Sequence, residues 1–342
     1  MAIILDGNGT IAGTNLQTHL FVKSSPQVVL FEKTGAGTAR TNQSLIIDVN
    51  RTTITVPALA PILMPALSAG TDYAIWCKPT GDLEATSNFI APPVSNSRFI
   101  GGFHYAPGGN ATARSGGNTT PQINEYSFYD LKFKPAVPDA RGMTLVAGSF
   151  WCDIYLTGVD AITNGSSRYN VAIARGTTPP KVPTMFGGDG TLTYGSYTWF
   201  EAMELAQAFN KRCPTQQEFV ALSYGTTEAT ASGGTDVPTT GITGTGATSA
   251  WNIFTSKWGI IQSTGCVWVW GMDRAGPAAA ASWNANTEGR GSEYNAPNAS
   301  LFGARWDDGS NSGSRCSNWN NAASNSAAYI GSRFCCDHII IN

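Results

Sequence analysis

Six short strand-like segments follow one another between Leu20 and about Thr120, and turns rich in Gly, Pro, Asn and Ser separate them. The segments are residues 19–23, 27–32, 44–49, 52–56, 72–77 and 98–105. Short β-rich runs at this spacing are typical of an antiparallel sandwich. We therefore expect a β-sandwich-like intermediate domain at residues 21–120. Residues 1–20 read as a short N-terminal β segment that is too small to hold a core alone.

Residues 121–342 follow a different pattern, which includes helices. Thr198 is a candidate N-cap, and Glu201 three residues later completes a capping box. The spacing predicts a helix over 199–212 with a mainly apolar face, in which the basic residues 211–212 complement the dipole at its C-terminal end. Thr215 and Glu218 form a second capping box for a short helix that ends near residue 222.

Strand-like runs at 126–133, 258–261 and 266–270 accompany these helices, and small residues at 108–118 form a flexible link. We place the boundary between the two domains in this link. The predicted fold is mostly β, with a small α+β domain at the C-terminus.

Residues 305–330 have neither the 3.6-residue apolar period of a helix nor the alternation of a long strand. They are small and polar, but Trp306 and Trp319 lie among them and an apolar run at 339–341 follows. Asn, Ser, Gly and Tyr are the adaptable contact residues of antibody-like binding surfaces. We interpret this stretch as a recognition face; the alternative is a surface loop region without function.

The charge and hydropathy of the sequence indicate which classes of partner to expect. The formal net charge is −2 and 13% of the residues are charged, which indicates neither a nucleic-acid partner nor a membrane surface. The sequence lacks a run of eighteen apolar residues, and its first fifteen residues lack the basic and apolar regions of a signal peptide. We expect synthesis in a cytoplasm and no membrane insertion.

The sequence carries no recognisable catalytic or metal motif. Its seven cysteines form an odd set without C-x-x-C spacing, which argues against a disulfide framework and a zinc site. Gly-x-Ser-x-Gly, P-loop and His-Glu-x-x-His patterns are absent. The triplet at 306–308 only approaches the Trp-Asn-Asp of calcium-dependent lectins. We expect no catalytic residue, no metal and no cofactor.

Several segments carry a resemblance to a known fold. Residues 198–202 through 211–219 resemble the two-helix signature of the formylglycine-generating-enzyme branch of the C-type lectin fold. Residues 258–270, 289–292 and 305–306 resemble later core strands and glycine turns of that branch. The resemblance implies a C-type lectin-like domain at 121–342.

A closer resemblance is to the major tropism determinant family of tailed phages that carry a diversity-generating retroelement. It rests on residues 64–75, 101–108, 139–148, 225–230 through 255–259, and 336–338. The similarity covers nearly all of the chain from about residue 20. The N-terminus is shorter than the family's β-prism-like first domain, which leaves the attachment to the fibre open.

The resemblance implies a homotrimeric receptor-binding protein at the tip of a phage tail fibre, in the virion. Its ligand-binding face, at about 303–333, would be rewritten by adenine-directed mutagenic reverse transcription. By position in the family's pattern, the exchangeable residues are Arg305, Asp307, Asp308, Gly309, Asn311, Asn318, Asn320, Asn321, Asn325, Ala327, Tyr329 and Ile330. All twelve can be reached from AAC or AAT codons by changing only adenines. The partners implied are a host cell-surface receptor (protein or glycan) and the tail fibre.

Residues between the exchangeable positions are expected to hold the backbone of this face. They are Trp306, Gly313, Arg315, Trp319 and Arg333. We expect both tryptophans to pack in the core because of their size, and both arginines to bond loop carbonyls.

Two other functions stay open. One is a cellular or prophage-encoded display protein of the same fold. The other is an oxidase of the formylglycine branch, whose enzymes use paired copper-binding cysteines. Cys335 and Cys336 are adjacent and Cys316 lies in a loop, so no pair in the sequence matches that arrangement.

Overall fold

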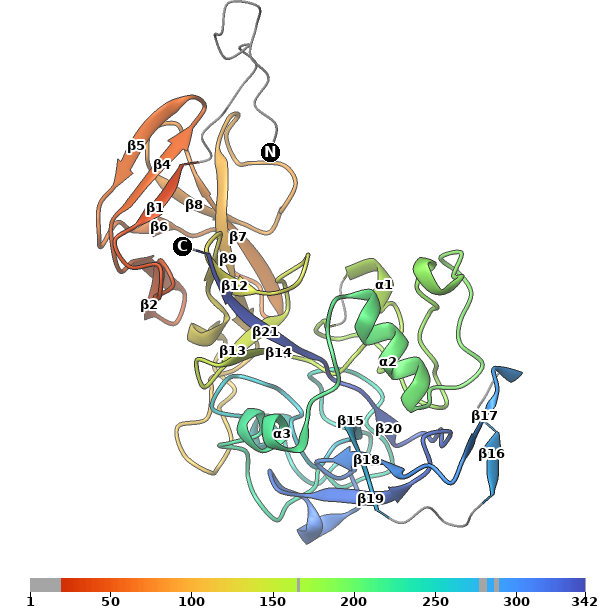
Figure 1. Ribbon diagram of the computed structural model, residues 1–342. Coiled ribbons are helices and arrows are strands. Elements are labelled where there is room, and N and C mark those ends of the chain that lie inside the picture. The colour runs from red at the N-terminus through yellow and green to blue at the C-terminus, as the bar shows by residue number, and fades with distance from the viewer. Residues whose placement is uncertain (1–19, 165–166, 277–281, 286–288, 342) are drawn as a thin grey trace, which may run out of the picture.

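The computed structural model describes residues 20–164, 167–276, 282–285 and 289–341 (Figure 1). The segment predicted at 1–20 therefore lies outside the described residues, apart from Leu20. The chain is mostly β, as predicted.

The first part of the chain forms two sheets and a hairpin. The smaller sheet contains β1 (Phe21–Lys23), β4 (Leu45–Val49) and β5 (Thr52–Val56), all antiparallel. β2 (Phe31–Gly35) and β3 (Thr38–Thr41) form the hairpin. The larger sheet has the order β10–β9–β7–β8–β6, and β11 also pairs with β9. Its strands are β6 (Ile62–Leu63), β7 (Thr71–Cys77), β8 (Leu83–Thr86), β9 (Arg98–Ala106), β10 (Gln122–Ile123) and β11 (Tyr129–Asp130).

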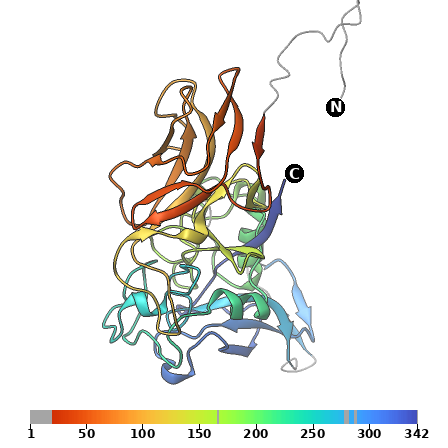
Figure 2. The same cartoon turned by 90° about the vertical axis from the view of Figure 1, so that its left-hand side faces the viewer.

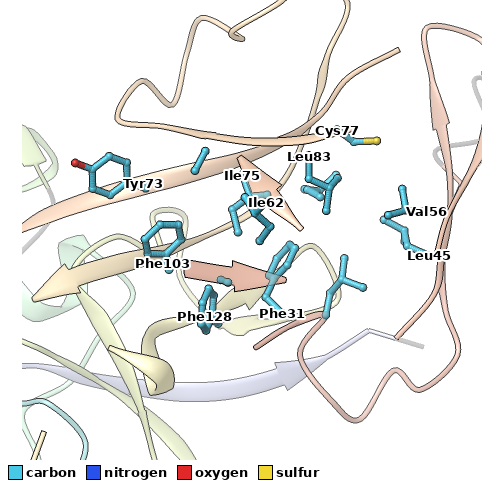
Figure 3. Packing of buried hydrophobic residues seen from close by; sticks show 14 of the residues in the cluster. Phe31, Leu45, Val56, Ile62, Tyr73, Ile75, Cys77, Leu83, Phe103 and Phe128 are labelled. Atoms are coloured by element: carbon cyan, nitrogen blue, oxygen red, sulfur yellow. The ribbon is translucent and has the colours of Figure 1, made fainter. Parts of the chain in front are cut away.

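Alternating apolar side chains close these sheets over one core. Leu45 and Ile47 of β4 are fully buried, whereas Ile46 between them is exposed. They belong to one buried cluster with Phe31 and Phe103, part of which Figure 3 shows. Each such side chain stabilises the fold by about 1.5–3 kcal/mol relative to an exposed position.

The second part of the chain begins and ends in one four-stranded sheet of order β12–β21–β14–β13. Its strands are β12 (Phe133–Pro135), β13 (Met143–Val146), β14 (Phe150–Asp153) and β21 (Cys335–Ile340). The C-terminal strand β21 is thus inserted between strands formed almost two hundred residues earlier (Figure 1). The predicted strand at 126–133 is divided among a 3₁₀ turn (Glu125–Ser127), β11 and β12.

Helices cover this part where the capping boxes predict them. α2 (Trp199–Ala208) and α3 (Gln216–Leu222) follow α1 (Ala161–Asn164), with further 3₁₀ turns at Thr184–Phe186 and Trp251–Phe254. The backbone N–H groups of Thr198 and Thr215 donate to the carboxylates of Glu201 and Glu218, at 2.7 and 2.9 Å. Among the described residues, no helix is long and apolar enough to cross a membrane.

The prediction that the first helix extends to residue 212 was wrong. α2 ends at Ala208, and Asn210 has a left-handed φ of 56°. The reason is that Lys211 turns inward and pairs with Asp153 at 2.6 Å, both side chains being buried. Lys211 therefore neutralises a buried carboxylate instead of complementing the helix dipole.

Residues 108–118 are held in place by backbone hydrogen bonds, which differs from the flexible link expected. Gly109 and Asn118 bond each other through both backbone groups. Ala111 N donates to Ser256 O at 3.1 Å, and Gly116 N donates to Gly225 O at 2.9 Å. The segment thus packs on the second part of the chain. The domain boundaries stay a prediction.

Candidate ligand-binding face

A second four-stranded sheet and the segments that connect its last strands carry the predicted face. It has the order β19–β18–β15–β20, from β15 (Trp268–Ala275), β18 (Asn298–Phe302), β19 (Ser317–Asn321) and β20 (Ile330–Gly331). The other predicted strand in this region, at 258–261, is irregular. The hairpin of β16 (Trp283–Ala285) and β17 (Ser292–Tyr294) connects β15 to β18. Figures 1 and 2 place this sheet at the end of the molecule opposite β4 and β5.

The turn between β18 and β19 is closed by its own acidic residues. Arg305 N donates to Asp308 Oδ2 at 2.8 Å. Arg305 Nε lies 2.5 Å from Asp307 Oδ1, as an ion pair that lacks the alignment of a hydrogen bond. A 3₁₀ turn at Gly309–Asn311 follows, and a Cβ at Gly309 would meet no atom within 4 Å. This turn therefore has open space at Gly309, although its left-handed φ of 54° favours glycine there.

An aromatic contact joins the two ends of the predicted face. The Arg305 guanidinium lies 4.3 Å from the ring centroid of Tyr329, a cation–π distance. Asn325 Nδ2 donates to Asn321 Oδ1 at 2.9 Å, which ties the segment after β19 to the strand itself. Arg305 and Tyr329 thus lie next to each other although 24 positions separate them in the chain.

Eleven of the twelve predicted residues reach the surface. Four are exposed: Asp307, Gly309, Asn311 and Asn320. Seven are half-buried: Arg305, Asp308, Asn318, Asn321, Asn325, Ala327 and Tyr329. Ile330 is the correction, because it is 0% exposed and its strand pairs in parallel with Trp268 inside the core. Its side chain cannot contact a ligand in this conformation.

The residues between the exchangeable positions point inward, with one exception. Trp306 is 8% exposed in a core cluster, and Trp319 packs on the same cluster with its ring edge-on to Phe302 at 6.1 Å. A Cβ at Gly313 would lie 2.4 Å from Glu228 Oε2, so a larger residue there would displace this carboxylate. Arg315 is exposed, and in the described part of the chain no hydrogen bond joins its guanidinium to a loop carbonyl.

Arg333 is fully buried behind the face and donates hydrogen bonds to four backbone carbonyls. Its Nη1 donates to the carbonyls of Asp153 and Ile154, both at 2.7 Å. Its Nη2 donates to those of Ile261 and Gln262, at 2.6 and 3.2 Å. Burial lowers the pKa of this guanidinium from its ordinary value. One side chain therefore ties the segment between β20 and β21 to two other chain segments.

Comparisons with known proteins show the family of this chain. A relative from Bordetella phage BPP-1, named "Tail fiber receptor-binding protein", is 51% identical over 347 aligned residues, covering 99% of this chain and 91% of the relative. The chain belongs to the major tropism determinant family. The family model described as "Mtd second domain" matches residues 29–130.

Solved structures of the family confirm the fold class. The "Major Tropism Determinant P3c Variant" superimposes with a TM-score of 0.93 at 52% identity, covering 97% of this chain and 90% of that one. The U1 variant gives 0.92 at 52% identity, covering 98% and 91%. This chain therefore has the family's mostly β fold, with a C-type lectin-like C-terminal domain.

Two anchors of the face were missed in the sequence. Glu228 accepts hydrogen bonds from Ser314 N at 2.9 Å and Ser314 Oγ at 2.6 Å. Arg175 pairs with Asp236 and donates to Ala328 O at 3.2 Å, which holds the segment before β20. The hydrogen bonds from Arg175 lower the pKa of Asp236. Glu228 is the lone charge between residues 225 and 235, which is the signal that could have revealed it.

Replacing Glu228 is expected to loosen the turn between β18 and β19 without unfolding the chain. In Glu228→Ala, Ser314 loses both acceptors, at a cost of up to about 2 kcal/mol. Hydrogen exchange of the backbone at 309–316 should accelerate, and exchange elsewhere should stay the same. Glu84→Ala, in the first part of the chain, is the control. Unchanged exchange at 309–316 would show that Glu228 does not anchor the face.

Buried thiols form one pair that the sequence did not reveal. Cys152 and Cys335 lie opposite each other on adjacent antiparallel strands, and all seven cysteines are free. Burial raises the pKa of Cys335 well above its ordinary value and that of Cys336 to about 12. In the described part of the chain, no group of three or more His, Cys, Asp or Glu side chains is placed to hold a metal ion.

Thiol reactivity is expected to be low and confined to one residue. Cys316 is half-buried with its pKa raised to about 11, mainly by burial, and the other six thiols are buried. Because the thiolate is the reactive form, alkylation of Cys316 should accelerate about tenfold per pH unit up to its pKa. Mass spectrometry of the native chain should find one modified cysteine at about pH 8. Fast labelling of Cys335 or Cys336 near neutral pH would contradict this description.

Proposed function

We propose that this chain is the receptor-binding protein of a phage tail fibre and that it contacts a host cell-surface receptor through its exchangeable face. The observation that carries the proposal is the division of residues 303–333 into two sets. Eleven predicted exchangeable residues reach the surface, while Trp306 and Arg333 are buried behind them. A fixed backbone limits the ordering entropy that binding costs. The phage relative's name supports the same function.

Binding at this face relies on a few side chains and on multivalency. Tyr329 supplies the aromatic anchor, while Arg305, Asp307 and Asp308 supply charge complementarity. The asparagines supply adaptable hydrogen bonds to a protein or a glycan. A shallow polar face binds weakly at one site. A homotrimer and several fibres per virion multiply that affinity through effective concentration.

The proposed location is the tip of the tail fibre in the virion, and retroelement mutagenesis is the proposed source of variation at the face. No catalytic step is proposed, because the thiols are buried with raised pKa values. Copper-dependent oxidation of a cysteine-containing peptide by the purified chain would instead support the oxidase function.

The proposal is tested by competition for adsorption. The purified chain, added to host cells before the phage that encodes it, should slow adsorption of that phage in a dose-dependent way. It should leave adsorption of an unrelated phage unchanged. If the purified chain does not compete, receptor binding is wrong. If it binds cells but is absent from purified virions, the cellular or prophage-encoded display protein is correct.

A further inference from the structure

A polar pocket of about 420 Å³ lies away from the exchangeable face, between the two parts of the chain. None of its lining residues falls within 303–333. Lys33 and Gln122 line it from β2 and β10 of the first part, and Tyr224 and Lys257 line it from the second part. Its volume is within the range of small-molecule sites, about 300–1,000 Å³.

Backbone hydrogen bonds fix the walls of this pocket. The segment 108–118 forms one wall, and its Ala111 and Gly116 amides donate to Ser256 and Gly225 of the second part. Lys257 N donates to Tyr224 O at 2.7 Å, which sets the opposite wall. The pocket is therefore formed before any ligand arrives, and preformed sites lose less entropy on binding.

The charged groups in the lining favour an anion. Lys33, Lys257 and Glu125 are the charged lining residues, which gives a local charge of +1 in a chain of net charge −2. Lys257 is exposed, and its Nζ lies 5.1 Å from the Trp258 ring centroid. Burial lowers the pKa of Lys33, although Glu125 opposes this effect. A bound carboxylate would compensate both ammonium groups.

The remaining lining groups favour a sugar ring over a bare anion. Tyr126 and Tyr224 supply aromatic surface, and the Tyr126 ring is held edge-on to Trp258 at 5.1 Å. Asn118 and Gln122 supply amide nitrogens, because Asn118 Oδ1 already accepts from Gly109 N and Thr120 N and Gln122 Oε1 already accepts from Lys33 Nζ. Aromatic rings suit the C–H face of a pyranose, and these amide nitrogens can donate to its hydroxyl groups.

We propose that this pocket is a second, non-diversified binding site for an acidic saccharide. The carboxylate lies between Lys33 and Lys257, the ring packs on the tyrosines, and the hydroxyls accept hydrogen bonds from the amide nitrogens. The source is either a free sugar acid or the end of a bacterial surface polysaccharide. The site is independent of the exchangeable face, so neither proposal depends on the other.

Calorimetric titration of the full chain with D-galacturonate, D-galactose and inorganic phosphate tests this proposal. Galacturonate should bind at least about tenfold more tightly than galactose, because only the acid pairs with the lysines. Lys257→Met keeps the side-chain stem and should weaken galacturonate binding by at least about tenfold. Lys181→Met, which lies outside the pocket, should leave galacturonate binding unchanged. Equal melting temperatures of the variants verify folding.

Three outcomes overturn the proposal: no binding of galacturonate at millimolar concentration, equal binding by the native chain and Lys257→Met, or phosphate binding as tight as galacturonate. A titration with trigalacturonate distinguishes the two sources of the ligand, a free sugar acid and the end of a surface polysaccharide. Tighter binding than the monosaccharide indicates a polysaccharide end, and equal binding indicates a free sugar acid.

Discussion

Arg333→Met is expected to lower the free energy of unfolding by about 3–5 kcal/mol, the largest effect of any single substitution considered. The guanidinium is fully buried and donates to the carbonyls of Asp153, Ile154, Ile261 and Gln262. Methionine fills part of the volume but leaves those four carbonyls without this donor in a dry interior. Chemical denaturation followed by tryptophan fluorescence measures the change.

The matched control is Arg315→Met, the same substitution eighteen residues earlier in the chain. Arg315 is exposed and makes no hydrogen bond to a loop carbonyl in the described residues. Its replacement should change stability by less than about 0.5 kcal/mol. Equal stability of both variants would mean that Arg333 does not hold the strands behind the face.

Tyr329→Ala is expected to weaken receptor binding about thirtyfold, equivalent to about 2 kcal/mol. Tyr329 is half-buried, and the Arg305 guanidinium stacks on its ring at 4.3 Å. The substitution removes both the aromatic anchor and the support that orders Arg305. The measurement is the concentration of purified chain that halves phage adsorption.

The control for this variant is Ile90→Ala, because Ile90 is 93% exposed in the first part of the chain, outside the face. It should compete as well as the native chain. If Tyr329→Ala also competes as well as the native chain, Tyr329 is not the anchor, and binding energy must come from other residues of the face.

Local signals in the sequence predict the elements that are stabilised locally. The capping boxes at Thr198 and Thr215 locate two helices because the reciprocal hydrogen bonds involve residues only three positions apart. The polar composition of 305–330 likewise indicates a surface, and all but one of the twelve predicted residues reach it.

Features that depend on distant partners could not be predicted. The end of α2 depends on Lys211 reaching Asp153, and the anchoring of the turn depends on Glu228, 86 residues from Ser314. The position of Ile330 in the family's pattern places it on the face, whereas its pairing with Trp268 buries it. A position in such a pattern carries no information on which way a side chain points.

Deep sequencing of codons 290–342 in a population of phages or cells that carry the gene tests the central claim most directly. The claim is that exchangeable side chains are displayed on a fixed backbone. It predicts adenine-directed substitutions at the eleven surface positions, only apolar residues at Ile330, and constant codons at Trp306, Gly313 and Arg333. An invariant 3′ end, or substitutions spread evenly over buried and exposed positions, would contradict it.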